Sequence, residues 1–199
     1  MNKFRNIISC SVLLMFLLAI VGCSQIEQSG EETTVKVEYN VEANNKSIKS
    51  IAHVLKSEFT SPKQKYNEIL NDPNNIMKIK GQKVLKASNG SELYQYIEDL
   101  YQPYFTISGF EKFFVASAFS YTLHSQKIQI KVDNISIKKN KNYKDDYEFI
   151  VNVKYKETGD SEKNYKIKGL ATIPEKDGKI ENITYVDDGG LLKKIKKNT

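Results

Sequence analysis

Cysteine is scarce in this chain of 199 residues, with only Cys10 and Cys23 present. Both lie near the N-terminus, so everything after residue 23 lacks a thiol. A thiol nucleophile, a cysteine-ligated metal and a disulfide framework are therefore excluded for most of the chain.

Histidine and arginine are almost as rare. His53 and His124 are the only histidines, and no arginine follows Arg5. Two histidines without cysteine make a zinc site improbable, and a lone histidine is more often a packed or surface residue than a catalyst. The net charge of +6 is mild for the length, so nucleic acid is not an expected partner.

Recognisable catalytic motifs are also missing. No glycine-rich phosphate loop and no serine in a nucleophile-elbow pattern occurs. The pairs Asp145-Asp146 and Asp187-Asp188 are adjacent residues, which point to opposite faces of an extended chain and so suit solvated turns rather than acid–base catalysis. We expect no enzymatic activity, no metal and no cofactor.

The N-terminus has the three-part organisation of a secretory signal peptide. Lys3 and Arg5 are followed by an uncharged apolar run over residues 12–21. That run is about half of the ~20 residues that a membrane-spanning helix needs, which favours a signal peptide over residues 1–22.

The residues that follow resemble the lipobox of bacterial lipoproteins, an aliphatic residue, a small or aliphatic residue, Gly or Ala, and then Cys. Ile20, Val21, Gly22 and Cys23 fit this pattern. The resemblance implies cleavage between Gly22 and Cys23 and a diacylglyceryl thioether on Cys23. The alternative is an ordinary cleaved signal that ends in cysteine. Two acyl chains suffice for stable membrane attachment.

The resemblance places the mature protein on the outer face of the cytoplasmic membrane, in a Gram-positive type of bacterium. An exported protein without disulfides agrees with that assignment. Processing before Cys23 leaves 28 basic and 24 acidic residues and a net charge of +4.

Composition divides the mature chain into three parts. Residues 23–32 are polar and aperiodic and form a lipidated flexible tether. Residues 33–188 form a single domain. Residues 189–199 form a basic tail, expected to be a solvated, frayed end rather than a membrane contact.

The first half of the domain has helical periodicity after an alternating segment at 33–41. Apolar residues recur every three or four positions, and Lys49, Lys56 and Glu58 are expected to face solvent. Helices are predicted at 47–59, from Ser61-Pro62 to 70, at 91–101, and from Ser108 to about 119, and Ser61, Ser91 and Ser108 are expected to be the N-caps of the last three. Residues 76–86 are a short strand or a hairpin around Gly81.

The second half alternates with a period of two, which predicts strands at 127–138, 147–157, 164–174 and 179–187. The alternation changes phase at Asp133-Asn134, which indicates a β-bulge. Asp177-Gly178 is typical of a hairpin turn, so the strands form an antiparallel meander with one apolar face and one lysine-rich face.

Helices followed by an antiparallel sheet indicate an α+β fold. This order resembles the nuclear-transport-factor-two-like, or cystatin-like, α+β roll. The likeness rests on the helical stripes at 48–70 and 93–101 and on the four strands, and no residue motif supports it. It implies N-terminal helices packed on a curved C-terminal sheet of about four strands.

An aromatic cluster lies between residues 94 and 121. At helical spacing such residues are usually core, and the alternative is a ligand pocket or a docking surface. The candidate surface residues are Tyr94, Tyr101, Tyr104, Phe105, Phe110, Phe113 and Phe114.

The functional hypothesis is a membrane-tethered, non-catalytic module that binds a protein partner or an envelope component. One alternative is a carrier of a small apolar ligand in an aromatic-lined cone. The other is an enzyme of the same roll fold. A large apolar cavity would favour the carrier, and a buried carboxylate or histidine in a cavity would favour the enzyme.

Overall fold

The computed structural model describes residues 36–39, 45–80, 82–121, 128–174 and 177–197. All of them belong to the unit Val35–Thr199. The segments predicted to be a signal peptide, a lipobox and a tether lie outside the described residues, as does His124.

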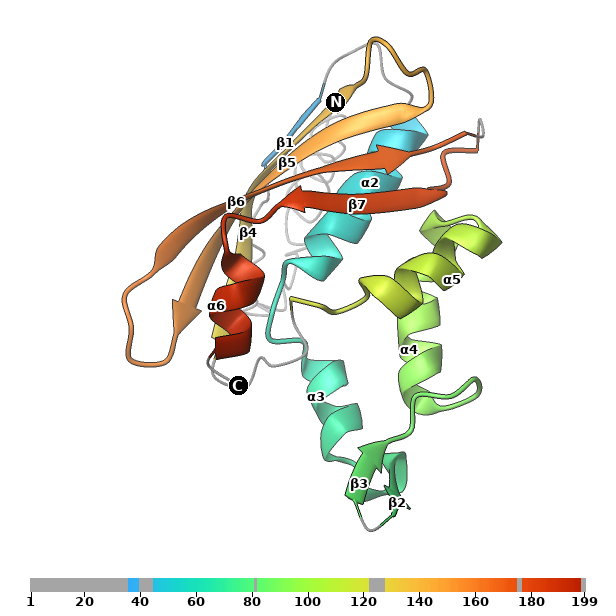
Figure 1. Cartoon of the computed structure of the whole chain (residues 1–199), viewed down its shortest axis with the longest axis vertical. Coiled ribbons are helices and arrows are strands. Elements are labelled where there is room, and N and C mark those ends of the chain that lie inside the picture. The colour runs from blue at the N-terminus through green and yellow to red at the C-terminus, as the bar shows by residue number, and fades with distance from the viewer. Residues whose placement is uncertain (1–35, 40–44, 81, 122–127, 175–176, 198–199) are drawn as a thin grey trace, which may run out of the picture. The chain divides into compact units, whose positions relative to one another are not determined.

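The described chain is an α+β domain, as predicted (Figure 1). Its helices are α2 (Asn45–Glu58), α3 (Gln64–Asn71), α4 (Glu92–Tyr101), α5 (Ile107–Ala116) and α6 (Leu191–Lys197), with short 3-10 turns η1 (Pro73–Asn75) and η2 (Gln102–Tyr104). Its strands are β1 (Lys36–Tyr39), β2 (Ile76–Ile79), β3 (Gln82–Leu85), β4 (Ile128–Lys139), β5 (Asp146–Glu157), β6 (Lys163–Thr172) and β7 (Asn182–Asp187).

Five strands form the main sheet in the order β1-β4-β5-β6-β7. Strands β4 to β7 are antiparallel neighbours, which confirms the predicted meander. Strand β1 adds a parallel strand at the edge beside β4. Strands β2 and β3 form a separate antiparallel hairpin, which settles the ambiguous segment around residue 81.

Two local features of the sheet, a bulge and a glycine-containing turn, lie where the sequence predicted them. The β4–β5 register shifts between Val132 and Asn134, so the bulge lies where the alternation changes phase. Gly178 has a φ of +82° in the turn between β6 and β7, a conformation that glycine adopts without steric cost.

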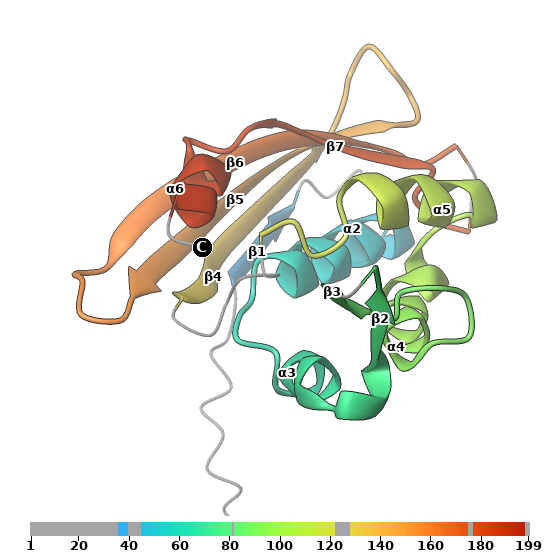
Figure 2. The ribbon, with the colours of Figure 1, turned by 60° about the horizontal axis from the view of Figure 1, so that its bottom comes forward.

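The helices cover one face of the sheet. Along β4 and β5, every second side chain is buried, while the intervening ones are more exposed and rich in lysine. Helix α2 contacts β4 and helix α5 contacts β7 beneath the sheet (Figure 2). Ile51, Val54 and Leu55 of α2 are fully buried, and each such side chain stabilises the fold by roughly 1.5–3 kcal/mol.

Two predicted helix starts are wrong. Ser61 does not cap the second helix, because its backbone pairs with Ile130 of β4 and its hydroxyl accepts from Ile130 N at 3.2 Å. Helix α3 therefore begins only at Gln64. Helix α5 is capped by Thr106, whose Oγ1 accepts from Gly109 N, and Ser108 lies within the helix. By contrast, Ser91 caps α4 as predicted.

The C-terminal segment is also more ordered than expected. Residues predicted to form a frayed end make helix α6, in which Leu191 and Ile195 are fully buried. Its lysines stay at or near the surface, and Lys194 pairs with Glu157 of β5 at 3.3 Å. The apolar residues at positions i and i+4 give this basic helix one face that joins the core.

Candidate functional site

A groove of about 410 Å³ lies between helix α5 and strand β7. We call it the α5–β7 groove. Residues of the 117–121 segment and of α6 complete its walls. It is lined by Gly109, Lys112, Phe113, Ala116, Ser117, Ser120, Tyr121, Asn182, Ile183, Thr184, Tyr185 and Leu192.

Gly109 allows the helix to approach the strand. A Cβ atom at this position would lie 2.4 Å from the carbonyl oxygen of Ile180 and 2.9 Å from that of Glu181. These are backbone atoms that cannot turn aside, so only glycine fits. The contact is reinforced by the Thr106 N–H, which donates to Ile180 O at 3.0 Å.

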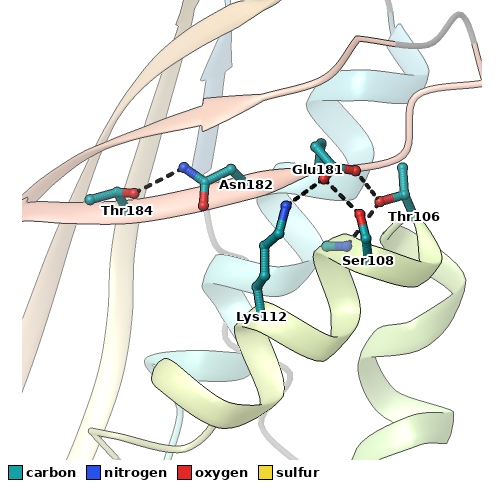
Figure 3. Close-up of polar contacts among 7 residues, drawn as sticks. Thr106, Ser108, Lys112, Glu181, Asn182 and Thr184 are labelled. Atoms are coloured by element: carbon teal, nitrogen blue, oxygen red, sulfur yellow. Dashed lines mark hydrogen bonds and ion pairs between the residues drawn. The ribbon is translucent and has the colours of Figure 1, made fainter.

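The carboxylate of Glu181 holds the start of helix α5 in place beside the groove (Figure 3). Glu181 accepts hydrogen bonds from Lys112 Nζ at 2.7 Å, from Thr106 Oγ1 at 2.5 Å and from Ser108 Oγ at 2.7 Å. These bonds, with that from Lys112 the largest cause, lower the pKa of Glu181 to about 2. The first turn of α5 is thus tied to the chain that enters β7.

The groove follows an edge of the sheet. Four consecutive residues of β7, Asn182 to Tyr185, line it. Because alternate side chains of a strand point to opposite faces, four consecutive residues can line one groove only where it runs along the edge of the strand. Strand β7 has β6 on one side and no strand on the other among the described residues. An edge strand offers unpaired backbone N–H and C=O groups, so this groove can accept an extended peptide.

The side chains in the groove are of mixed character. Tyr185 is a partly exposed aromatic residue, and Lys112 and Asn182 supply exposed polar groups. Phe113 and Tyr121 also border the groove but are only 3% and 4% exposed. A mixture of aromatic and hydrogen-bonding groups is typical of protein-binding surfaces. His53 does not line the groove.

The predicted aromatic residues are divided between core and surface. Tyr101, Phe105, Phe110 and Phe113 are 0–5% exposed, and of the candidates only Phe113 lines the groove. Tyr94, Tyr104 and Phe114 are partly exposed.

The partly exposed aromatics pack against neighbours of their own. The ring centroids of Tyr94 and Phe114 are 5.2 Å apart, and Tyr104 stacks on His53 at 3.9 Å. Burial lowers the pKa of His53. The cluster therefore serves mostly as core, and the residues of β7 that complete the groove carried no sequence signal.

Glu58 is the main buried polar residue that the sequence analysis missed. Predicted to face solvent, it is 0% exposed. One oxygen, Oε2, accepts from Tyr101 Oη at 3.1 Å and from the backbone N–H of Phe119 at 3.0 Å. Positions 51, 54, 55 and 58 share one helical face, so the spacing itself signalled burial.

Burial raises the pKa of Glu58 to about 7, and the hydrogen bonds from Phe119 and Tyr101 oppose that shift. Nearby, burial lowers the pKa of Lys63 to about 8. Within the described residues, Glu58 Oε1 and the Tyr185 hydroxyl are buried without a hydrogen-bond partner. Glu58 does not line the α5–β7 groove, so it is a core carboxylate rather than a group facing an open site.

Within the described part of the chain, no group of three or more His, Cys, Asp or Glu residues is arranged to hold a metal ion. Nor does any described helix have the length and hydrophobicity needed to cross a membrane.

Comparison with protein-family models, with curated proteins and with solved structures returns no match. Evidence on function therefore comes from the sequence and from the geometry of the described residues.

Proposed function

We propose that this chain is a membrane-anchored extracytoplasmic lipoprotein whose domain binds a protein partner without catalysis. The N-terminal sequence supports the anchor, since a basic start and a short apolar run end in a lipobox-like Ile20-Val21-Gly22-Cys23. The observation that carries the binding function is the α5–β7 groove, which opens along the edge strand β7.

The alternatives receive less support from the geometry. A carrier of an apolar ligand needs an apolar cavity in the aromatic region, but there Tyr101, Phe105 and Phe113 pack against one another. An enzyme needs its titratable group in an open site, and Glu58 is enclosed in the core. An extended segment of a partner, in contrast, can pair with β7 and place side chains against the exposed Ala116 and the partly exposed Leu192.

Site-specific photo-crosslinking in cells tests this proposal. A photoreactive residue replaces Ala116, which lines the groove, and the control replaces Gln95, which is exposed on α4 outside it. We expect a discrete crosslinked adduct from position 116 and none from position 95. An added Gly109→Ala change should abolish the adduct while the protein stays at the membrane.

Adducts of equal yield at the two positions would contradict a partner site in the groove. So would an adduct at position 116 that consists only of a small molecule, because that result favours the carrier.

A further inference from the structure

The outward face of the sheet, on the side opposite the helices, is dominated by lysine. Side chains that point away from the core on β4, β5 and β6 include six lysines and three carboxylates. The lysines are Lys131, Lys138, Lys154, Lys156, Lys166 and Lys168. The carboxylates are Asp133, Asp146 and Glu148. We call this surface the lysine face.

Ion pairs neutralise only part of the lysine face. Lys154 lies 3.6 Å from Asp133 and 3.9 Å from Glu162, and Lys168 lies 3.4 Å from Asp187 of β7. Counted with Glu162 and Asp187, six lysines stand against five carboxylates, so the face keeps a small excess of positive charge, which attracts an anionic surface.

Two hollows on the lysine face differ in chemistry. One, of about 390 Å³, is lined by Lys154, Lys166 and the amides of Asn152 and Asn164, which are groups that bind phosphate oxygens. The carboxylate of Asp133 also lines it and pairs with Lys154. The other, of about 350 Å³, is lined mainly by apolar and basic groups, together with one carboxylate. Its lining includes Ile150, Leu170, Val186, Lys138, Lys168 and Glu148.

The apolar residues of the second hollow are unusual for a solvent-facing sheet. Leu170 is 41% and Val186 is 67% exposed. A soluble polyanion would leave these side chains in water, whereas a bilayer interface offers phosphates and acyl chains together.

From this combination we infer that the lysine face docks on the anionic membrane surface to which the chain is tethered. The inference rests on the proposed lipid anchor. The 12 residue-to-residue steps from Cys23 to Val35 can span at most about 40 Å, so the domain stays close to the bilayer. Tethering raises the effective concentration of the surface, and weak attraction per lysine then suffices. In this orientation the face carrying the helices points away from the membrane.

Fluorescence on reconstituted vesicles tests the docking. The mature lipidated protein carries a fluorophore on Asn164→Cys, in the lysine face, or on Glu98→Cys, exposed on α4. Vesicles of phosphatidylglycerol or of phosphatidylcholine contain a lipid-attached quencher. We expect quenching of the Asn164 probe in phosphatidylglycerol only, its loss in about 1 M salt, where the Debye length is about 3 Å, and little quenching of the Glu98 probe.

Matched triple variants test the role of charge. Near an anionic membrane, each lysine favours the docked state by a factor of about five, so the triple change Lys131→Gln, Lys156→Gln and Lys166→Gln should lower the docked population ratio about 100-fold. The same charge change on α6, at positions 193, 196 and 197, should leave it unchanged. Thermal unfolding checks that both variants remain folded.

Equal quenching on both lipids, or equal effects of the two triple variants, would overturn the docking. Protein that fails to float with phosphatidylcholine vesicles contradicts the anchor instead, and the Asn164 probe in phosphatidylglycerol still decides whether the face docks.

Discussion

Replacing Glu58 with glutamine should change how the stability of the domain depends on pH. The native state holds the proton of Glu58 up to about pH 7, while an unfolded chain releases it near pH 4.5. Between these values the native state binds more protons, so the wild-type free energy of unfolding falls as pH rises. A separation of 2.5 pKa units corresponds to roughly 3 kcal/mol.

Glutamine keeps the shape of the side chain and an acceptor for the Tyr101 hydroxyl and the Phe119 N–H, but it cannot ionise. The free energy of unfolding of the variant, relative to that of the wild type, should therefore rise by up to about 3 kcal/mol as pH increases from 4.5 to 7.5. Lys63, whose pKa burial lowers to about 8, stays mostly protonated up to pH 7.5.

Urea unfolding of the mature protein, followed by circular dichroism across this pH range, measures the effect. Glu98→Gln on the exposed side of α4 is the control and should follow the wild type. Parallel stability curves for the wild type and Glu58→Gln would refute the conclusion that the buried carboxylate destabilises the domain at neutral pH.

Two further changes address the groove. Gly109→Ala places a methyl group against the carbonyl of Ile180 and should cost about 1–3 kcal/mol in urea unfolding, whereas Val115→Ala, at a position 86% exposed on the same helix, should cost almost nothing. Glu181→Gln should cost about 1 kcal/mol at pH 7; because the Glu181 pKa is lowered, this difference from the wild type should vanish as pH falls from 4.5 towards 2, and an unchanged difference at low pH would contradict the role of its charge.

Regular patterns predicted much of the fold. Alternation in the second half placed four strands within a few residues of their observed bounds, and the phase change at Asp133 located the bulge. These features depend on local side-chain periodicity, which the sequence displays directly.

Features that depend on distant contacts were harder to predict. Ser61 was expected to cap a helix, but its backbone pairs with Ile130, 69 residues away. The role of Glu181 depends on α5 lying against β7, which no local pattern indicates. Glu58 is different, because its helical position already marked the buried face; its charge alone suggested exposure.

The lipid on Cys23 is the central claim of the proposed function, because location and partner access both depend on it. Metabolic labelling with a radioactive fatty acid, followed by membrane fractionation, tests it directly. The account predicts a labelled protein in the membrane fraction, and an unlabelled Cys23→Ser variant that is lost from that fraction. An unlabelled wild-type protein, or a Cys23→Ser variant that stays with the membrane as the wild type does, would contradict it.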